Sequence, residues 1–262
     1  MFLSIPKMKH QALLAFGGNL ATPADTFRSV MQELSASAEI LVTTNSDFYQ
    51  TEAIGGRPGQ PLFLNAAIWI ETSLSASQLI EHLLLIETRL GRTREQRWDA
   101  RTVDLDIMLF DDLQSSRTNC RIPHPRMTFR RFMLEPAESI AADWHHPVCN
   151  RTIGQLLHQL NTRPAVCCLL GSATSWSQAT RQTLHAITDN FGYTLVTVDR
   201  QDHQDQDSLE AAKLYLVEAP SSHPDGIPGP YLQIGGMTEQ QLTVELEAAL
   251  QAIASRPVRI VD

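Results

Sequence analysis

Several features are scarce or missing in this 262-residue sequence, and each absence excludes a class of protein. No uninterrupted apolar run approaches about 18 residues, so no segment is expected to cross a bilayer. The opening MFLSIPKMKH places no basic residue before its apolar letters and is a poor signal peptide. The four cysteines show neither CxxC nor Cys/His ligand spacing, which excludes a zinc ribbon or a disulfide framework. We therefore expect a reduced, cytoplasmic chain.

Lysine is also scarce, because the chain has only three, whereas ten arginines lie between Arg89 and Arg131. The formal charge of −8 argues against a polyanionic ligand, but the charge is unevenly spread. Residues 1–163 carry 16 basic and 17 acidic residues, and residues 164–262 carry 5 and 12. Arginine offers phosphate oxygens a planar fork that lysine lacks. The first part of the chain therefore suits a phosphate ligand, with a solvated basic face as the alternative.

Apolar patterning predicts the order β-α-β-β-α-β for the first 110 residues. Strands are expected within 12–16, 40–50, 64–71 and 103–110, and helices after Thr22 and Ser75. Turns and a closing helix near 153–160 follow. The simplest architecture for this order is an α+β fold with a ferredoxin-like βαββαβ domain, which we assign to residues 1–162.

Residues 163–262 predict a second, small α/β domain of unknown function. Strands are expected at 166–170, 193–198, 213–218 and 231–234, and helices at 176–191 and after Thr238. The strand at 166–170 runs into GSATS, the layout of a phosphate loop without its second glycine or its lysine. Nucleotide binding is not expected there. A degenerate phosphate-loop relic and a packing, dimerisation or regulatory module both stay open.

The segment RWDARTVDLDIMLF, residues 97–110, carries the sharpest chemical signal. In a strand, Asp104 and Asp106 project from one face, about 7 Å apart along the chain. Their carboxylates repel unless a cation lies between them, and Mg²⁺ binds one or two carboxylates together with substrate phosphates. With the nearby arginines, this pattern predicts transfer of a phosphoryl-type group; an acidic strand end without function is the alternative. The other strand residues are expected to point into a core: Val103, Leu105, Ile107 and Leu109.

This segment closely resembles the signature of the 6-hydroxymethyl-7,8-dihydropterin pyrophosphokinase family, whose members act in the folate pathway. The resemblance runs from about residue 10 to 160. It includes GGNL (17–20), SDFYQT (46–51), FLNAA (63–67) and IPHPRM (122–127). It implies a ferredoxin-like fold, and transfer of the β,γ-diphosphate of ATP to the hydroxymethyl group of the pterin with release of AMP.

The resemblance also implies roles on the ATP side. Asp104 and Asp106 would hold two Mg²⁺ ions that bridge the phosphates and the pterin hydroxyl. Arg92 and Arg101 would grip the phosphates, which completes the expected catalytic set. Further ATP contacts are implied for Glu87, Arg94, Trp98, Ile107, His124 and Arg130. Trp98 would act as a lid, with loops 91–101 and 55–61 closing over the substrates. An exposed helix acid for Glu87 and a structural role for His124 are the alternatives.

On the pterin side, the amide of Asn65 can both donate and accept hydrogen bonds, which suits an aminopyrimidinone edge. The resemblance implies that Phe63 and Phe132 would sandwich the flat ring, with plain core positions as the alternative. The remaining pterin contacts would come from Asp104 and from backbone groups around Thr51 and Ile54.

Two other functions compete with this reading. An RNA-binding module would use aromatic pairs on the sheet face and would not need paired acids. The second alternative is an inactive scaffold, with the tail as its active partner. The metal and arginine motifs favour the enzyme, with ATP and the pterin as partners and no nucleic acid or membrane.

The chain departs from the family pattern at two positions. In the family, glycine and proline often stand where this chain has Asp99 and Ala100, so the rigidity of loop 91–101 is expected to differ.

Overall fold

The computed structural model describes residues 10–56, 58–92, 100–162, 165–170, 177–198, 212–217, 227 and 229–260. The first part of the chain forms a β-sheet with helices packed on it. The elements are β1 (His10–Gly18), α1 (Pro23–Ala36), β2 (Ile40–Asn45), β3 (Phe48–Thr51), β4 (Phe63–Thr72), α2 (Ala76–Arg89) and β5 (Asp104–Phe110). Strand β1 is central, with antiparallel neighbours β4 and β5, and β3 and β2 both pair with β4. The α+β class is confirmed.

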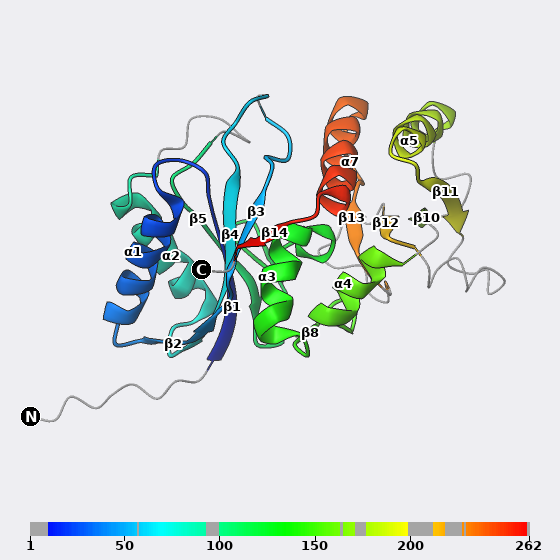
Figure 1. Cartoon of the computed structure of the whole chain (residues 1–262). Coiled ribbons are helices and arrows are strands. Elements are labelled where there is room, and N and C mark those ends of the chain that lie inside the picture. The colour runs from blue at the N-terminus through cyan, green and yellow to red at the C-terminus, as the bar shows by residue number, and fades with distance from the viewer. Residues whose placement is uncertain are drawn as a thin grey trace, which may run out of the picture.

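Helices α1 and α2 cover one face of this sheet (Figure 1). Ser75 begins α2 with the predicted capping box, because its backbone N–H donates to Gln78 Oε1 at 3.0 Å and its hydroxyl accepts from the Gln78 N–H. The apolar stripe at helical spacing is buried: Leu79, Leu83 and Ile86. This packing fixes the face of β5 that lies away from the helices, where Asp104 and Asp106 project.

The second face of the sheet is covered by a helix that the sequence analysis did not predict, α3 (Arg131–Ala141). It follows a short 3-10 turn, η1 (Met127–Phe129), and contains Pro136. A proline inside a helix removes one backbone donor, so it argued against a helix here. Tertiary packing overrides that penalty, since Met133, Leu134 and Ala137 are all buried against the sheet.

One orientation in β5 was predicted wrongly. The register between β1 and β5 shifts between Leu13 and Leu14, so Met108 is an extra residue in β5. Leu105 and Ile107 point toward α1 and α2 as expected, but Leu109 lies in the core on the α3 side. The irregularity falls after Asp106 and leaves the two predicted acids on the same face.

The tail forms a four-stranded parallel sheet in the order β11-β10-β12-β13. Its strands are β10 (Val166–Leu170), β11 (Thr194–Val198), β12 (Leu214–Val217) and β13 (Tyr231–Gln233), and its helices are α5 (Gln178–Asn190) and α7 (Glu239–Ala254). These elements confirm the predicted strands and helices. Along the chain, the elements that come between the strands of the two sheets include β6 (Ser115–Arg117), β7 (Cys120–Ile122), β8 (His145–His146), β9 (Arg151–Thr152) and α4 (Ile153–Asn161).

The tail is joined to the first sheet in two ways. One apolar core continues from α3 through α4 into β10 and α7. The last strand, β14 (Val258–Ile260), then returns to the first sheet and pairs antiparallel with the outer edge of β3 (Figure 1). Arg259 on β14 donates to Asp47 Oδ2 at 2.7 Å beside that edge. The domain boundary near residue 162 stays a prediction. Among the described residues, no helix is long and apolar enough to cross a membrane.

Candidate active site

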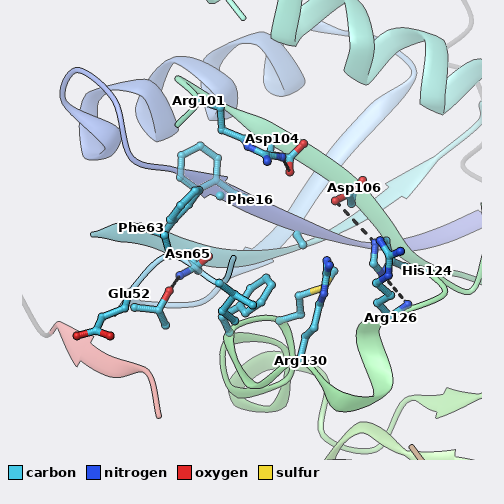
Figure 2. A pocket seen from close by; sticks show the side chains of 17 residues that line it. Phe16, Glu52, Phe63, Asn65, Arg101, Asp104, Asp106, His124, Arg126 and Arg130 are labelled. Carbon is cyan, nitrogen blue, oxygen red and sulfur yellow. Dashed lines mark hydrogen bonds and ion pairs between the residues drawn. The ribbon is translucent and has the colours of Figure 1, made fainter. Parts of the chain in front are cut away.

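A cavity of about 320 Å³ opens where β1 and β3 end, β4 and β5 begin, and α3 starts (Figure 2). It brings together ten residues named from the sequence: Thr51, Ile54, Phe63, Asn65, Arg101, Asp104, Asp106, His124, Arg130 and Phe132. These residues come from positions 51 to 132, so the fold gathers four separate sequence segments at one site. Asp106, His124, Arg126 and Arg130 lie together at one end and Glu52, Phe63 and Asn65 at the other, with Arg101 and Asp104 between them (Figure 2).

Asp104 is held by two arginines at the start of β5. Its Oδ1 lies 2.7 Å from Arg92 Nη1, and its Oδ2 lies 2.5 Å from Arg101 Nη1. The side chain of Asp104 is 25% exposed and that of Asp106 is 42% exposed, so both carboxylates stay accessible. The guanidinium groups therefore supply positive charge beside Asp104.

Glu87, at the end of α2, is buried with 2% exposure, so the alternative of an exposed helix acid is wrong. Its Oε1 accepts a 2.8 Å hydrogen bond from the Leu105 N–H and forms an ion pair with Arg92. Glu87 does not line the cavity. It links α2 to β5 and orients Arg92 toward Asp104, so its contacts are those of a positioning residue.

The turn after β1 fixes the backbone of Arg101. The N–H groups of Asn19 and Leu20 donate to the Arg101 carbonyl at 3.0 and 3.2 Å, and the Arg101 N–H donates to Asn19 Oδ1 at 2.8 Å. Gly18 allows this approach, since a Cβ there would lie 2.6 Å from the Thr102 carbonyl oxygen. The GGNL segment thus serves to hold the arginine that contacts Asp104.

Gly18→Ala is therefore expected to lower the free energy of unfolding by about 1–3 kcal/mol, because the new methyl group must push two backbone segments apart. Urea denaturation would measure the change. Gly17→Ala is the matched control: a Cβ at Gly17 would lie 3.6 Å from Asn65 Oδ1, an ordinary contact. Equal stability of the two variants would contradict this account of Gly18.

A cationic wall faces the acids across the cavity (Figure 2). It consists of His124, Arg126 and Arg130, and His124 Nε2 lies 4.0 Å from Asp106 Oδ2. Burial, together with Arg130 and Arg126, lowers the pKa of His124 to about 3, so its imidazole is neutral at pH 7. Burial and Arg126 lower the pKa of Arg130 to about 10, which leaves its guanidinium charged. The wall therefore presents two full charges and one neutral imidazole.

Asn65 forms the other end of the cavity. It is 4% exposed, and its Nδ2 donates to the Tyr49 carbonyl at 3.1 Å and to Thr51 Oγ1 at 3.0 Å. Both hydrogens of the amide are thus directed at β3, and Oδ1 faces Gly17 on β1. These bonds fix the amide plane before any ligand arrives.

Phe63 and Phe132 are both half-buried and line the cavity, so they are not plain core residues. Phe63 stands at the start of β4 and Phe132 in the first turn of α3, and the Arg130 guanidinium carbon lies 5.3 Å from the Phe132 ring centroid. The two rings leave the cavity an apolar end suited to a flat aromatic ligand.

The remaining predicted residues lie elsewhere. Ile107 belongs to the core under α1 and α2 and does not line the cavity. Arg94 and Trp98 lie outside the described residues, as do most of loop 91–101 and Asp99. Seven further residues line the cavity without a role predicted from the sequence: Ala15, Phe16, Gly17, Glu52, Ala53, Arg126 and Met133. Arg126 could have been found from its position two residues after His124 in IPHPRM.

The donor set fits Mg²⁺ only if a ligand completes it. Within the described ranges, no cluster of three or more His, Cys, Asp or Glu side chains could hold a metal ion by itself. Two accessible carboxylates on one strand face, beside arginines, match the way Mg²⁺ binds through one or two carboxylates plus substrate phosphates.

Comparison with known proteins agrees with the geometry. A family profile described as 7,8-dihydro-6-hydroxymethylpterin-pyrophosphokinase matches residues 13–142. The 2-amino-4-hydroxy-6-hydroxymethyldihydropteridine pyrophosphokinase of Synechocystis sp. is 37% identical over 156 residues, which are 60% of this chain and 79% of that protein. The chain belongs to this pyrophosphokinase family.

A second family member, from Bacillus subtilis, is 40% identical over 133 residues, or 51% of this chain and 79% of that protein. Among solved structures, wild-type Plasmodium falciparum HPPK-DHPS with pteroate aligns at a TM-score of 0.43 and 13% identity, covering 92% of this chain and 62% of that chain. The family profile ends at residue 142 and so leaves out α4, α5, α7 and the parallel sheet.

Proposed function

We propose that this chain transfers the diphosphate of ATP to 6-hydroxymethyl-7,8-dihydropterin and releases AMP, a step of folate biosynthesis. The observation that carries the proposal is one cavity lined by Asp104, Asp106 and three arginines and also by Asn65, Phe63 and Phe132. The antiparallel order β5-β1-β4-β3, with both crossover helices on one face, supports a ferredoxin-like assignment for this part of the chain.

In the proposed reaction, the hydroxymethyl oxygen of the pterin forms a bond with the β-phosphorus of ATP. The bond between that phosphorus and the oxygen of the departing AMP breaks, and the hydroxyl proton passes to solvent. Asp104 and Asp106 would hold two Mg²⁺ ions. When bound, these ions supply neutralising charge to the phosphates.

The residues of the chain hold and orient the substrates. Arg92 and Arg101 lie against Asp104 and would offer planar donors to the phosphates. The ion pair with Glu87 orients Arg92. Arg130 adds charge from the opposite wall, and neutral His124 offers a hydrogen bond without a charge. Asn65 and Thr51 would read the pterin edge while Phe63 and Phe132 stack on the ring, which places its hydroxymethyl group next to the phosphates.

The direct test is to mix the protein with ATP, Mg²⁺ and 6-hydroxymethyl-7,8-dihydropterin and to quantify AMP by chromatography. We expect AMP and the pterin diphosphate in equal amounts, and none when Mg²⁺ is chelated. No AMP above a protein-free control would refute the proposal.

The pterin end of the site can be tested separately with Asn65→Ala. Losing a buried, oriented amide is expected to raise the KM for the pterin about 10- to 100-fold, because Oδ1, the amide atom left for the ring when both Nδ2 hydrogens are bonded to Tyr49 and Thr51, can no longer accept from it. The KM for ATP should change little. Asn45→Ala, at the exposed end of β2, is the control and should behave like the wild type. An equal rise of both KM values would mean that Asn65 supports the whole site and does not read the pterin.

A further inference from the structure

An ion pair joins the tail to a residue that lines the cavity. Glu245, in the middle of α7, accepts a 2.8 Å hydrogen bond from Arg126 Nη2 through its Oε2. Arg126 lines the cavity beside His124 and Arg130 (Figure 2). Residue 245 lies beyond the family match, which ends at 142, so a residue from the unmatched part of the chain contacts a cavity-lining residue in the matched part.

The two partners differ in their surroundings. The Glu245 side chain is only 7% exposed, whereas that of Arg126 is 31% exposed and reaches the cavity. A buried carboxylate is stable only with a good partner, and its geometry is then fixed by the packing around it. Glu245 is therefore the rigid member of the pair, and Arg126 is the member that a ligand can reach.

The packing that fixes Glu245 is extensive. Its neighbours Leu242, Leu246 and Ala249 on α7 are buried in the core shared with α3. The helix end is tied down as well, because Arg131 Nε donates to the Ile253 carbonyl at 2.5 Å. Helix α7 is thus anchored on the segment that follows Arg126.

The charge balance of the wall also depends on Glu245. Arg126 lowers the pKa of Arg130, and Glu245 acts in the opposite direction on the same group. The positive charges of Arg126 and Arg130 repel each other. The negative charge of Glu245 offsets this repulsion and lets both guanidinium groups stay in the wall.

We propose that Glu245 is a positioning residue for the ATP site: from α7 it holds Arg126 against the cavity wall so that the guanidinium meets the ATP phosphates. This inference rests on the proposed pyrophosphokinase function. It makes the unmatched tail a structural part of the nucleotide site and not an independent appendage.

Steady-state kinetics of the full chain would test it with E245Q, R126Q and the double variant. In E245Q we expect the KM for ATP to rise about 3- to 10-fold, with the KM for the pterin unchanged, because one charge-assisted bond that orients Arg126 is weakened. R126Q should raise the KM for ATP at least as much. In the double variant E245Q should add nothing, since its effect passes through Arg126. E247Q is the matched control: Glu247 is an exposed acid on the same helix and should give wild-type values.

Three outcomes would overturn the inference: an unchanged KM for ATP in E245Q, an additive effect in the double variant, or a lower KM for ATP, which would mean that Glu245 holds Arg126 away from the nucleotide. If E245Q does not fold, the double variant removes both charges together and is compared with R126Q alone. If wild-type protein forms AMP while E245Q matches it, only this inference fails; if wild-type protein forms no AMP, the proposed function fails first.

Discussion

Asp104→Ala is expected to lower the rate of AMP formation on the order of 10³-fold or more. Asp104 is the acid that both Arg92 and Arg101 contact, and it would be a ligand of the proposed Mg²⁺ site. Its removal takes away a metal ligand and also leaves two guanidinium groups without the carboxylate that aligns them. Because the side chain is 25% exposed, the loss should be far larger in rate than in stability.

The measurement is the initial rate of AMP release at several Mg²⁺ concentrations. In Asp104→Ala the concentration of Mg²⁺ that gives half of the maximal rate should rise, which separates a metal-binding role from a purely electrostatic one. Asp112→Ala removes an exposed acid two residues after β5 and is the control. A rate within a factor of about three of wild type in Asp104→Ala would remove the central element of the mechanism.

Arg131→Met is expected to lower the free energy of unfolding by about 3–5 kcal/mol, the range seen when one member of a buried charged network is removed. The Arg131 side chain is 5% exposed. Its Nη2 donates to the Leu160 carbonyl at 2.8 Å and its Nε to the Ile253 carbonyl, while Glu135 lies 3.4 Å away. Removing the guanidinium leaves two buried carbonyls without this donor. It also removes the positive charge that partly offsets the burial of Glu135, whose pKa burial already raises.

Chemical denaturation followed by circular dichroism and by tryptophan fluorescence would measure this loss and show whether both sheets unfold together. Arg121→Met, at an exposed position in β7, is the control and should stay within about 0.5 kcal/mol of wild type. A loss below about 1 kcal/mol in Arg131→Met would show that water replaces the lost donor, and that this arginine does not join α3, α4 and α7.

Local periodicity predicted the elements whose pattern is set by their own residues. The alternation around Asp104 and Asp106 and the capping box at Ser75 follow from strand and helix geometry alone, and both are present. Helix α3 was missed because Pro136 opposes it locally and only the sheet beneath it supplies the stabilising burial. Leu109 was misplaced because a register shift against a neighbouring strand leaves no mark in the segment itself.

The site was predictable where one segment carries the chemistry, and unpredictable where distant segments meet. The short spacing of Arg92, Arg101, Asp104 and Asp106 already predicted that these side chains lie close together. The burial of Glu87 depends on how α2 packs against β5, which no short window of sequence records. The contact between Arg126 and Glu245 joins residues 119 positions apart and arises only when the tail helix docks on the first part of the chain.

The return of β14 to β3 has a consequence for how the protein is made. Strand β3 carries Thr51, whose hydroxyl accepts from Asn65, and in the part of the chain that the structure describes its outer edge is paired by residues 258–260. In a chain that is still being translated, β3 can already pair with β4 through one edge. Its other edge stays open until some two hundred further residues have been added. This edge is closed by a segment made long after β3, so a chain that stops before residue 258 keeps residues 13–142, which the family profile matches, and still exposes a strand edge that invites aggregation.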